Sequence, residues 1–102
     1  MERHPAKRVE IVIEAVMERR LTEALTQAGV TGFTVLPVRG GSGRSGPWSR
    51  EGQVGRTGMV AVVAILRAER VDEALDAVMK VLSRQIGVVN LTDCEVMRAE
   101  RF

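Results

Sequence analysis

The chain has 102 residues, of which 45% are hydrophobic and 27% charged, with a formal net charge of +2. This length predicts a single domain, residues 1–102, with one modest core. No apolar run reaches the roughly 18–20 residues of a membrane-spanning helix, and the charged start has no signal-peptide segment. The one cysteine, Cys94, excludes an internal disulfide framework and favours a reducing, cytoplasmic location.

The positive charge is concentrated in residues 39–58. This segment contains four arginines, one glutamate, seven of the ten glycines and the only tryptophan, so its net charge is +3. The other 82 residues together carry a net charge of −1. Arginine presents a planar set of donors that fits small oxyanions. The segment therefore predicts binding of a small anion or of one partner surface, rather than diffuse binding to nucleic acid.

The first part of the chain predicts a strand, a helix and a second strand. After a loose start over residues 1–6, apolar residues recur at every second position between Lys7 and Glu14, as in a strand. An amphipathic helix follows, with apolar residues at Met17, Leu21, Leu25 and Ala28. Gly29 suits the left-handed residue that ends a helix. The β-branched segment 31–38 predicts the second strand.

The same pattern returns after a long loop over residues 39–58. Eight consecutive apolar residues, 59–66, predict a strand that is buried on both faces. A second amphipathic helix is indicated by Val71, Ala74, Leu75, Val78 and Leu82. Residues 88–97 predict a final strand in which the alternation changes phase. We expect a bulge near Thr92 and Asp93 to account for this change.

This order of elements predicts a ferredoxin-like α+β sandwich. Two βαβ units with right-handed crossovers form a βαββαβ chain, with both helices on one face of a four-stranded antiparallel sheet. The helices cover only one face, yet residues 59–66 are apolar on both. The uncovered face therefore predicts a homo-oligomer, with three sheets around a common axis as one arrangement.

Residues 41–46 match the pattern G-x-G-x-x-G of dinucleotide-binding folds, but their context excludes that fold. Pro47 follows, no helix begins there, and an apolar strand occupies the region where an acid is required. Glycine and serine N–H groups can still form an anion-binding nest, to which Arg39 and Arg44 add charge-assisted hydrogen bonds. A flexible linker without a ligand is the alternative.

The other residues carry no catalytic or metal-binding pattern, so we expect a binding protein and not an enzyme. The two central strands lack the aromatic residues on which RNA recognition motifs stack bases. His4 and Cys94 are too far apart in the sequence to indicate a metal site within one subunit. Trp48 is either a partner anchor or a packing residue. Solvated or salt-bridged roles are expected for Glu10, Glu14, Glu95 and Glu100.

Together these segments resemble the PII-like signalling proteins. The resemblance rests on the segment 31–35 (TGFTV), the glycine-rich start of the loop at 40–43 (GGSG), the turn at 86–89 (IGVV) and an arginine-bearing end. It extends from about Lys7 to Phe102 and is closest to the small branch associated with bicarbonate transporters and carboxysomes.

The resemblance implies a homotrimer with nucleotide sites in the clefts between subunits. Residues 39–58 correspond to the T-loop, which closes over phosphates and docks on a target protein through Trp48, Arg50 and Arg56. The implied nucleotide contacts come from the second strand, the start of the T-loop, the turn before the last strand (the B-loop) and the C-terminal segment: Thr34, Val35, Leu36, Gly40, Gly41, Ser42, Gly43, Arg44, Gly87, Val88, Val89, Asn90, Arg98 and Arg101. Bicarbonate is assigned to Gly41, Ser42 and Arg44.

The implied function is signal transduction in inorganic carbon metabolism. The ligands are AMP or ADP, with ATP and cyclic AMP as further options, together with bicarbonate; no tightly bound cofactor and no metal are implied. The B-loop lacks the basic residue of classical PII proteins, which disfavours a triphosphate, and the absence of tyrosine excludes their tyrosine-modification switch.

The implied target is a protein such as a bicarbonate transporter or a carboxysome-associated protein. The chain would act in the cytoplasm and reach a membrane or a carboxysome through that partner. The alternative is a trimeric ferredoxin-like protein without a nucleotide, either a CutA-like metal binder or an ACT-like small-molecule binder.

Overall fold

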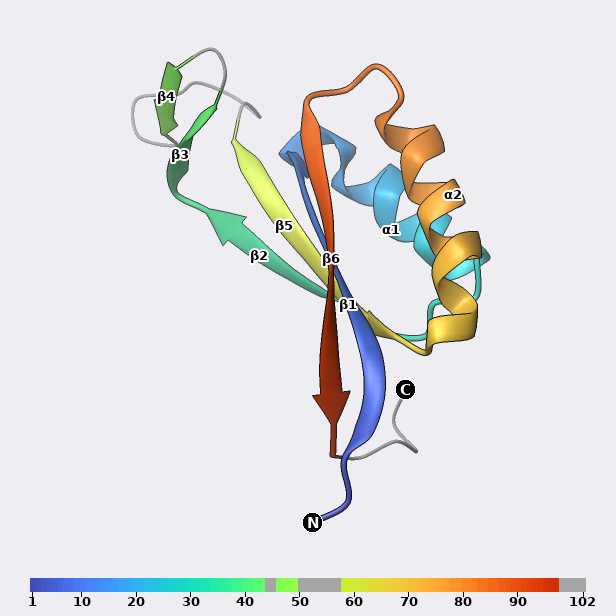
Figure 1. Ribbon diagram of the computed structural model, residues 1–102. Coiled ribbons are helices and arrows are strands. Elements are labelled where there is room, and N and C mark those ends of the chain that lie inside the picture. The colour runs from blue at the N-terminus through green and yellow to red at the C-terminus, as the bar shows by residue number, and fades with distance from the viewer. Residues whose placement is uncertain (44–45, 50–57, 98–102) are drawn as a thin grey trace.

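The computed structural model describes residues 1–43, 46–49 and 58–97. Four strands form one sheet in the order β2-β5-β1-β6, and every neighbouring pair is antiparallel. They are β1 (His4–Glu14), β2 (Thr34–Val38), β5 (Met59–Leu66) and β6 (Gly87–Val96). The helices α1 (Glu18–Gln27) and α2 (Val71–Leu82) cover the same face of this sheet (Figure 1). The predicted ferredoxin-like sandwich is confirmed.

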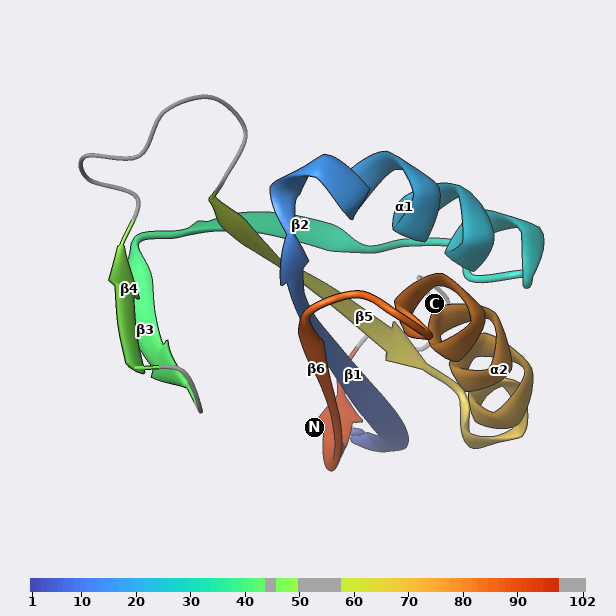
Figure 2. The same ribbon diagram turned by 90° about the horizontal axis from the view of Figure 1, so that it is seen from above.

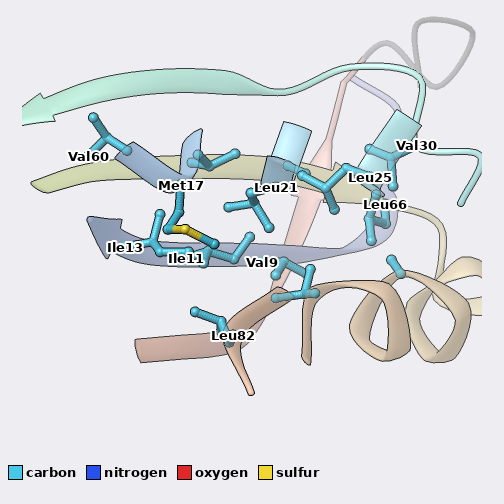
Figure 3. Packing of buried hydrophobic residues seen from close by; sticks show 14 of the residues in the cluster. Val9, Ile11, Ile13, Met17, Leu21, Leu25, Val30, Val60, Leu66 and Leu82 are labelled. Atoms are coloured by element: carbon cyan, nitrogen blue, oxygen red, sulfur yellow. The ribbon is translucent and has the colours of Figure 1, made fainter. Parts of the chain in front are cut away.

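The core lies between the sheet and the two helices (Figure 3). Every second residue of β1 and β5 points towards the helices, and the two strands place these residues opposite one another in register. The helices contribute the apolar stripe that their spacing predicts. The core residues that these four elements contribute are Val9, Ile11, Ile13, Val60, Val62, Ala64, Leu66, Leu21, Leu25, Val71, Ala74, Val78 and Leu82.

The observed starts of the central strand β1 and of the edge strand β2 differ from the sequence prediction. β1 begins at His4 instead of Lys7, because residues 4–6 pair with 94–96 of β6. β2 begins at Thr34 instead of Thr31. The predicted end of α1 is correct: Gly29 has a φ of 89°, and its N–H donates to the carbonyl oxygen of Thr26 at 3.1 Å.

The predicted bulge in the last strand is wrong. β6 pairs with β1 in one unbroken register from His4↔Val96 to Ile13↔Gly87. The change of phase has another cause, because the paired strands extend past the helices (Figure 1). Val89 lies on the helix-covered face and packs on the core, whereas Asp93 lies further along that face, is exposed and pairs with Lys7.

The predicted loop 39–58 contains secondary structure. Residues Gly40–Gly43 form β3 and residues Gly46–Ser49 form β4, which pair as a two-stranded antiparallel ribbon. Seen from above, this ribbon stands apart from both helices, beyond the end of β2 (Figure 2). Glycine and serine give these short strands no hydrophobic alternation, so the pattern of the sequence does not indicate them.

The face of the sheet away from the helices, here named the open face, is not covered by any other part of the described chain. Within one chain, residues 59–66 are covered by the helices on one face only: Val62 is fully buried, whereas Ile65, on the open face, is 39% exposed. Burial of the second face by another copy stays a prediction. Across residues 1–43, 46–49 and 58–97, no helix has the length and apolar character needed to cross a membrane.

Candidate functional site

The predicted phosphate contacts Gly40–Gly43 form β3, and all of them are exposed. Gly43 pairs with Gly46 across two intervening residues, so hydrogen-bonded positions alternate along the ribbon. The N–H groups of Gly41 and Gly43 consequently face β4, whereas those of Gly40 and Ser42 point away from it. The predicted nest over 41–46 includes residues outside the described part of the chain; within the described part, Gly46 has a positive φ of 108°, and β3 itself is extended.

The predicted adenine contacts lie on the edge strand β2. Val35 faces the helices and packs against the core. Thr34 and Leu36 lie on the open face, because they pair with Val63 and Ala61 of β5. Leu36 is 47% exposed and gives this edge an accessible apolar surface.

The B-loop contacts lie at the start of β6, which is the opposite edge of the sheet. Val88 is 63% exposed on the open face, and Val89 packs against the core on the other. Asn90 is engaged within the chain: its Nδ2 donates to Oε1 of Glu10 at 3.2 Å.

The two groups of predicted contacts share one end of the sheet but not one edge. The last residue of β2, Val38, pairs with Met59, which pairs with Glu14 on β1. The neighbouring residue of β1, Ile13, pairs with Gly87 of β6. The strands β5 and β1 thus separate the two groups by three strand spacings, roughly 14 Å. One chain does not bring them into contact.

Several predicted site residues fall outside the described part of the chain: Arg44, Arg50, Arg56, Arg98 and Arg101. Of the predicted partner-binding residues, Trp48 belongs to β4 and pairs with Gly41. Neither of two open grooves in the described structure contains a predicted site residue. One groove, of about 470 Å³, lies between α1 and α2, and the other, of about 460 Å³, lies between residues 29–31 and 65–70.

A polar cluster on the open face connects β1 with β6. Oε2 of Glu10 accepts a hydrogen bond from Nη2 of Arg8 at 3.2 Å, and its Oε1 accepts the bond from Asn90. These bonds, Asn90 first and Arg8 second, hold the pKa of Glu10 below its ordinary value, so the carboxylate is ionised. The spacing of Arg8 and Glu10 predicts a shared strand face. The sequence gives no sign of the register that adds Asn90.

The described residues offer no metal centre. No group of three or more histidine, cysteine, aspartate or glutamate side chains lies close enough within residues 1–43, 46–49 and 58–97 to hold an ion. Cys94 is half-buried and has a free thiol.

Family comparison identifies the chain. The model of the nitrogen regulatory protein P-II family matches residues 6–101. The chain belongs to the P-II family. This confirms the family that the sequence resembles, and it leaves the CutA-like and ACT-like alternatives without support. Among curated proteins, no individual sequence matches the chain significantly.

Solved structures of P-II-like proteins share the fold. CPII from Thiomonas intermedia K12, bound to ADP, AMP and bicarbonate, has 25% identity and a TM-score of 0.89, over 99% of this chain and 96% of CPII. CPII bound to ADP and bicarbonate has 28% identity and a TM-score of 0.85, over 99% and 97%. A PII-like protein from Thermus thermophilus has 24% identity and a TM-score of 0.81, over 100% and 99%. The bicarbonate in CPII agrees with the branch that the resemblance favours.

Proposed function

We propose that this protein is a regulatory sensor, not an enzyme, that binds AMP or ADP together with bicarbonate in the clefts between the subunits of a homotrimer. The observation that carries the proposal is the similarity to CPII, which binds ADP, AMP and bicarbonate and matches 99% of this chain. In this proposal residues 1–102 form one PII-like domain, and residues 39–58 are its T-loop.

The sheet supports a site that is shared between subunits. The proposed T-loop contacts follow the edge strand β2 in the sequence, and the proposed B-loop contacts lie on the other edge strand, β6. A cyclic assembly brings two different surfaces of neighbouring copies together, and in this proposal they are the β2 edge of one copy and the β6 edge of the next. Such a cleft joins two groups that one chain keeps apart, and the same assembly covers the exposed apolar residues of the open face.

The β3 edge supports the assignment of phosphate and bicarbonate to the T-loop. The N–H groups of Gly40 and Ser42 point away from β4 and are exposed. Glycine at positions 40, 41 and 43 lets an oxyanion approach the backbone without meeting a Cβ. Arg44 follows directly in the sequence and adds a charge-assisted donor.

The B-loop edge favours a short phosphate chain. Asn90 is neutral, and its amide donates to the ionised carboxylate of Glu10. The segment 87–90 contains no basic residue, which would attract further phosphate groups. AMP and ADP are therefore better ligands than ATP in this proposal. The exposed side chain of Leu36 supplies an apolar surface for the adenine ring.

Signalling follows from ordering of the T-loop. Ordering costs about 1–2 kcal/mol per residue, so a ligand can hold only as much of the loop as its contacts offset. Trp48, Arg50 and Arg56 then dock on a protein target, such as a cytoplasmic surface of a bicarbonate transporter or a carboxysome-associated protein.

Calorimetry with ADP and AMP, each with and without bicarbonate, tests the proposal. Arg44→Ala and Arg101→Ala should each weaken ADP binding by about 1.5–3 kcal/mol, because each loses a charge-assisted contact. Arg84→Ala is the matched control, since Arg84 is exposed beyond the end of α2 and outside the proposed site. Unchanged ADP affinity in both test variants would remove this site.

A further inference from the structure

The open face combines an apolar row with a polar one. The apolar row crosses all four strands through Leu36, Ala61, Val12 and Val88. Its two ends, Leu36 and Val88, are 47% and 63% exposed. Between these ends, Ala61 is buried and Val12 is half-buried. Ile65 adds a third exposed apolar side chain to the same face, and large apolar side chains exposed on one sheet face are typical of a surface that another protein covers.

The polar row next to it contains a neutral cluster. Glu10 and Asn90 lie side by side in register, and Arg8 and Thr92 form the next pair along the same strands. Glu10 uses both carboxylate oxygens, one for Arg8 and one for Asn90, at 3.2 Å each. The ionised Glu10 balances the charge of Arg8, so the cluster as a whole carries no net charge.

A second copy of this chain fits this face better than a charged partner does. A charged surface gains little from a cluster whose charge is already balanced. The guanidinium of Arg8 has five N–H groups, of which only some can bond Glu10. The hydroxyl of Thr92 and the Oδ1 of Asn90 are acceptors on the same face. The face therefore presents both donors and acceptors to a copy of itself.

We propose that Arg8, Glu10 and Asn90 set the register in which copies of this chain pack their open faces together. The inference rests on the proposed homotrimer and adds which residues fix its geometry. Burial of an ion pair costs desolvation free energy, so such a pair contributes more to specificity than to affinity. Apolar contacts are weakly directional, whereas a buried polar group favours the one register in which its hydrogen bonds are made.

If this cluster sets the register, variants of Arg8 or Glu10 alone should assemble differently from the double variant. Arg8→Met leaves Glu10 without its cation in the interface, and Glu10→Met leaves Arg8 without its anion. Each should raise the dissociation constant of the assembly at least roughly tenfold, since an unpaired buried charge is strongly unfavourable. The double variant removes both charges, so it should associate about as tightly as the wild type. It should also populate species of other masses, because the register is lost.

Light scattering over a dilution series, without nucleotide, measures these effects. Lys7→Met is the matched control: Lys7 pairs with Asp93 across the same two strands but on the opposite face, so it should leave assembly unchanged. Circular dichroism verifies folding. If a charge variant does not fold, Asn90→Leu at an exposed position replaces it and should weaken assembly several-fold.

The outcomes separate the two proposals. A wild type that stays monomeric at every concentration would overturn the proposed trimer and this inference together. A wild type that assembles, with single variants that assemble as tightly, would overturn the inference alone. A double variant with the single mass of the wild type would also overturn it, because the cluster would then not set the register.

Discussion

Gly87 begins β6 at a point where the fold leaves no room for a side chain. A Cβ added there would lie 2.6 Å from Cδ2 of Leu82 and 2.9 Å from the carbonyl oxygen of Val12. The side chain of Leu82 can turn away from an added Cβ, but the backbone of Val12, which is paired in the sheet, cannot. We therefore expect Gly87→Ala to lower the free energy of unfolding by about 1–3 kcal/mol, measured by urea denaturation.

Gly32 provides the matched control for Gly87. A Cβ at Gly32 meets no atom within 4 Å, and Gly32 does not have a positive φ. Gly32→Ala should leave the free energy of unfolding within about 0.5 kcal/mol of the wild type. Equal losses in both variants would contradict the packing explanation. If it holds, glycine at position 87 is explained by packing and is not itself evidence of a phosphate contact.

Glu10 gives the stability of the fold a dependence on pH. Its pKa is held below the ordinary value of 4.5 by the hydrogen bonds from Asn90 and Arg8. The unfolded chain thus binds the proton more readily than the folded one. The stabilisation from Glu10 is complete above its unfolded pKa and is lost as the pH falls through the lower folded pKa.

Comparison of the wild type with Glu10→Gln tests this pH dependence. At pH 7 the wild type should have the higher free energy of unfolding, because the glutamine carries no charge for Arg8. The difference should shrink as the pH falls below the ordinary pKa of 4.5 and should disappear only below the lower pKa of the folded protein, where the wild-type carboxyl is protonated in both states. Urea denaturation at both pH values measures it. A difference that is the same at neutral and acid pH would contradict the role of the ionised carboxylate.

At the scale of elements, the periodicity of apolar residues is sufficient to predict the helices and the central strands. The predicted strand 59–66 has the observed bounds of β5, and the predicted apolar stripe of α2 is buried apart from the half-buried Leu75. Periodicity does not predict the structure where the apolar residues of a strand do not all lie on one face. β6 extends past the helices, so its apolar residues change face without a bulge, and the ribbon β3–β4 contains no apolar alternation at all.

The helix α2 gives a direct test of this periodicity. Val78 is fully buried between α2 and the sheet, whereas its neighbour Met79 is 54% exposed. Val78→Ala should lower the free energy of unfolding by roughly 1.5–3 kcal/mol, because it removes two buried methyl groups and leaves a cavity. Met79→Ala, the control one position away, should change it by less than about 0.5 kcal/mol. Similar values for the two would show that α2 does not pack as described.

At the scale of the whole molecule, the sequence suggests which segments could form a site but does not show which of them meet. The glycine-rich segment, the B-loop turn and the arginines can be recognised along the chain. Which of them meet depends on strand order, and the order β2-β5-β1-β6 puts the T-loop and B-loop contacts on opposite edges. No pattern within one chain encodes how the edge of one copy lies against the edge of another, because that geometry belongs to the interface.

A ligand that binds between subunits must also strengthen the contact between them. If ADP contacts β3 of one copy and β6 of its neighbour, it binds the assembly and not the monomer, so linkage requires ADP to lower the dissociation constant of the assembly. We expect a decrease of at least roughly tenfold at saturating ADP. Light scattering of diluted protein with and without ADP measures it.

The variant Arg44→Ala is the control for this linkage. It should assemble like the wild type without ligand, because the proposed T-loop, residues 39–58, contributes no strand to the four-stranded sheet. It should also gain less from the same concentration of ADP. The informative contrary result is ADP binding that leaves the dissociation constant unchanged. Such binding would place the nucleotide within one chain, where the described residues keep the two groups of contacts on opposite edges of the sheet. The edge-to-edge cleft would then have to be replaced by a site that uses only one of these groups.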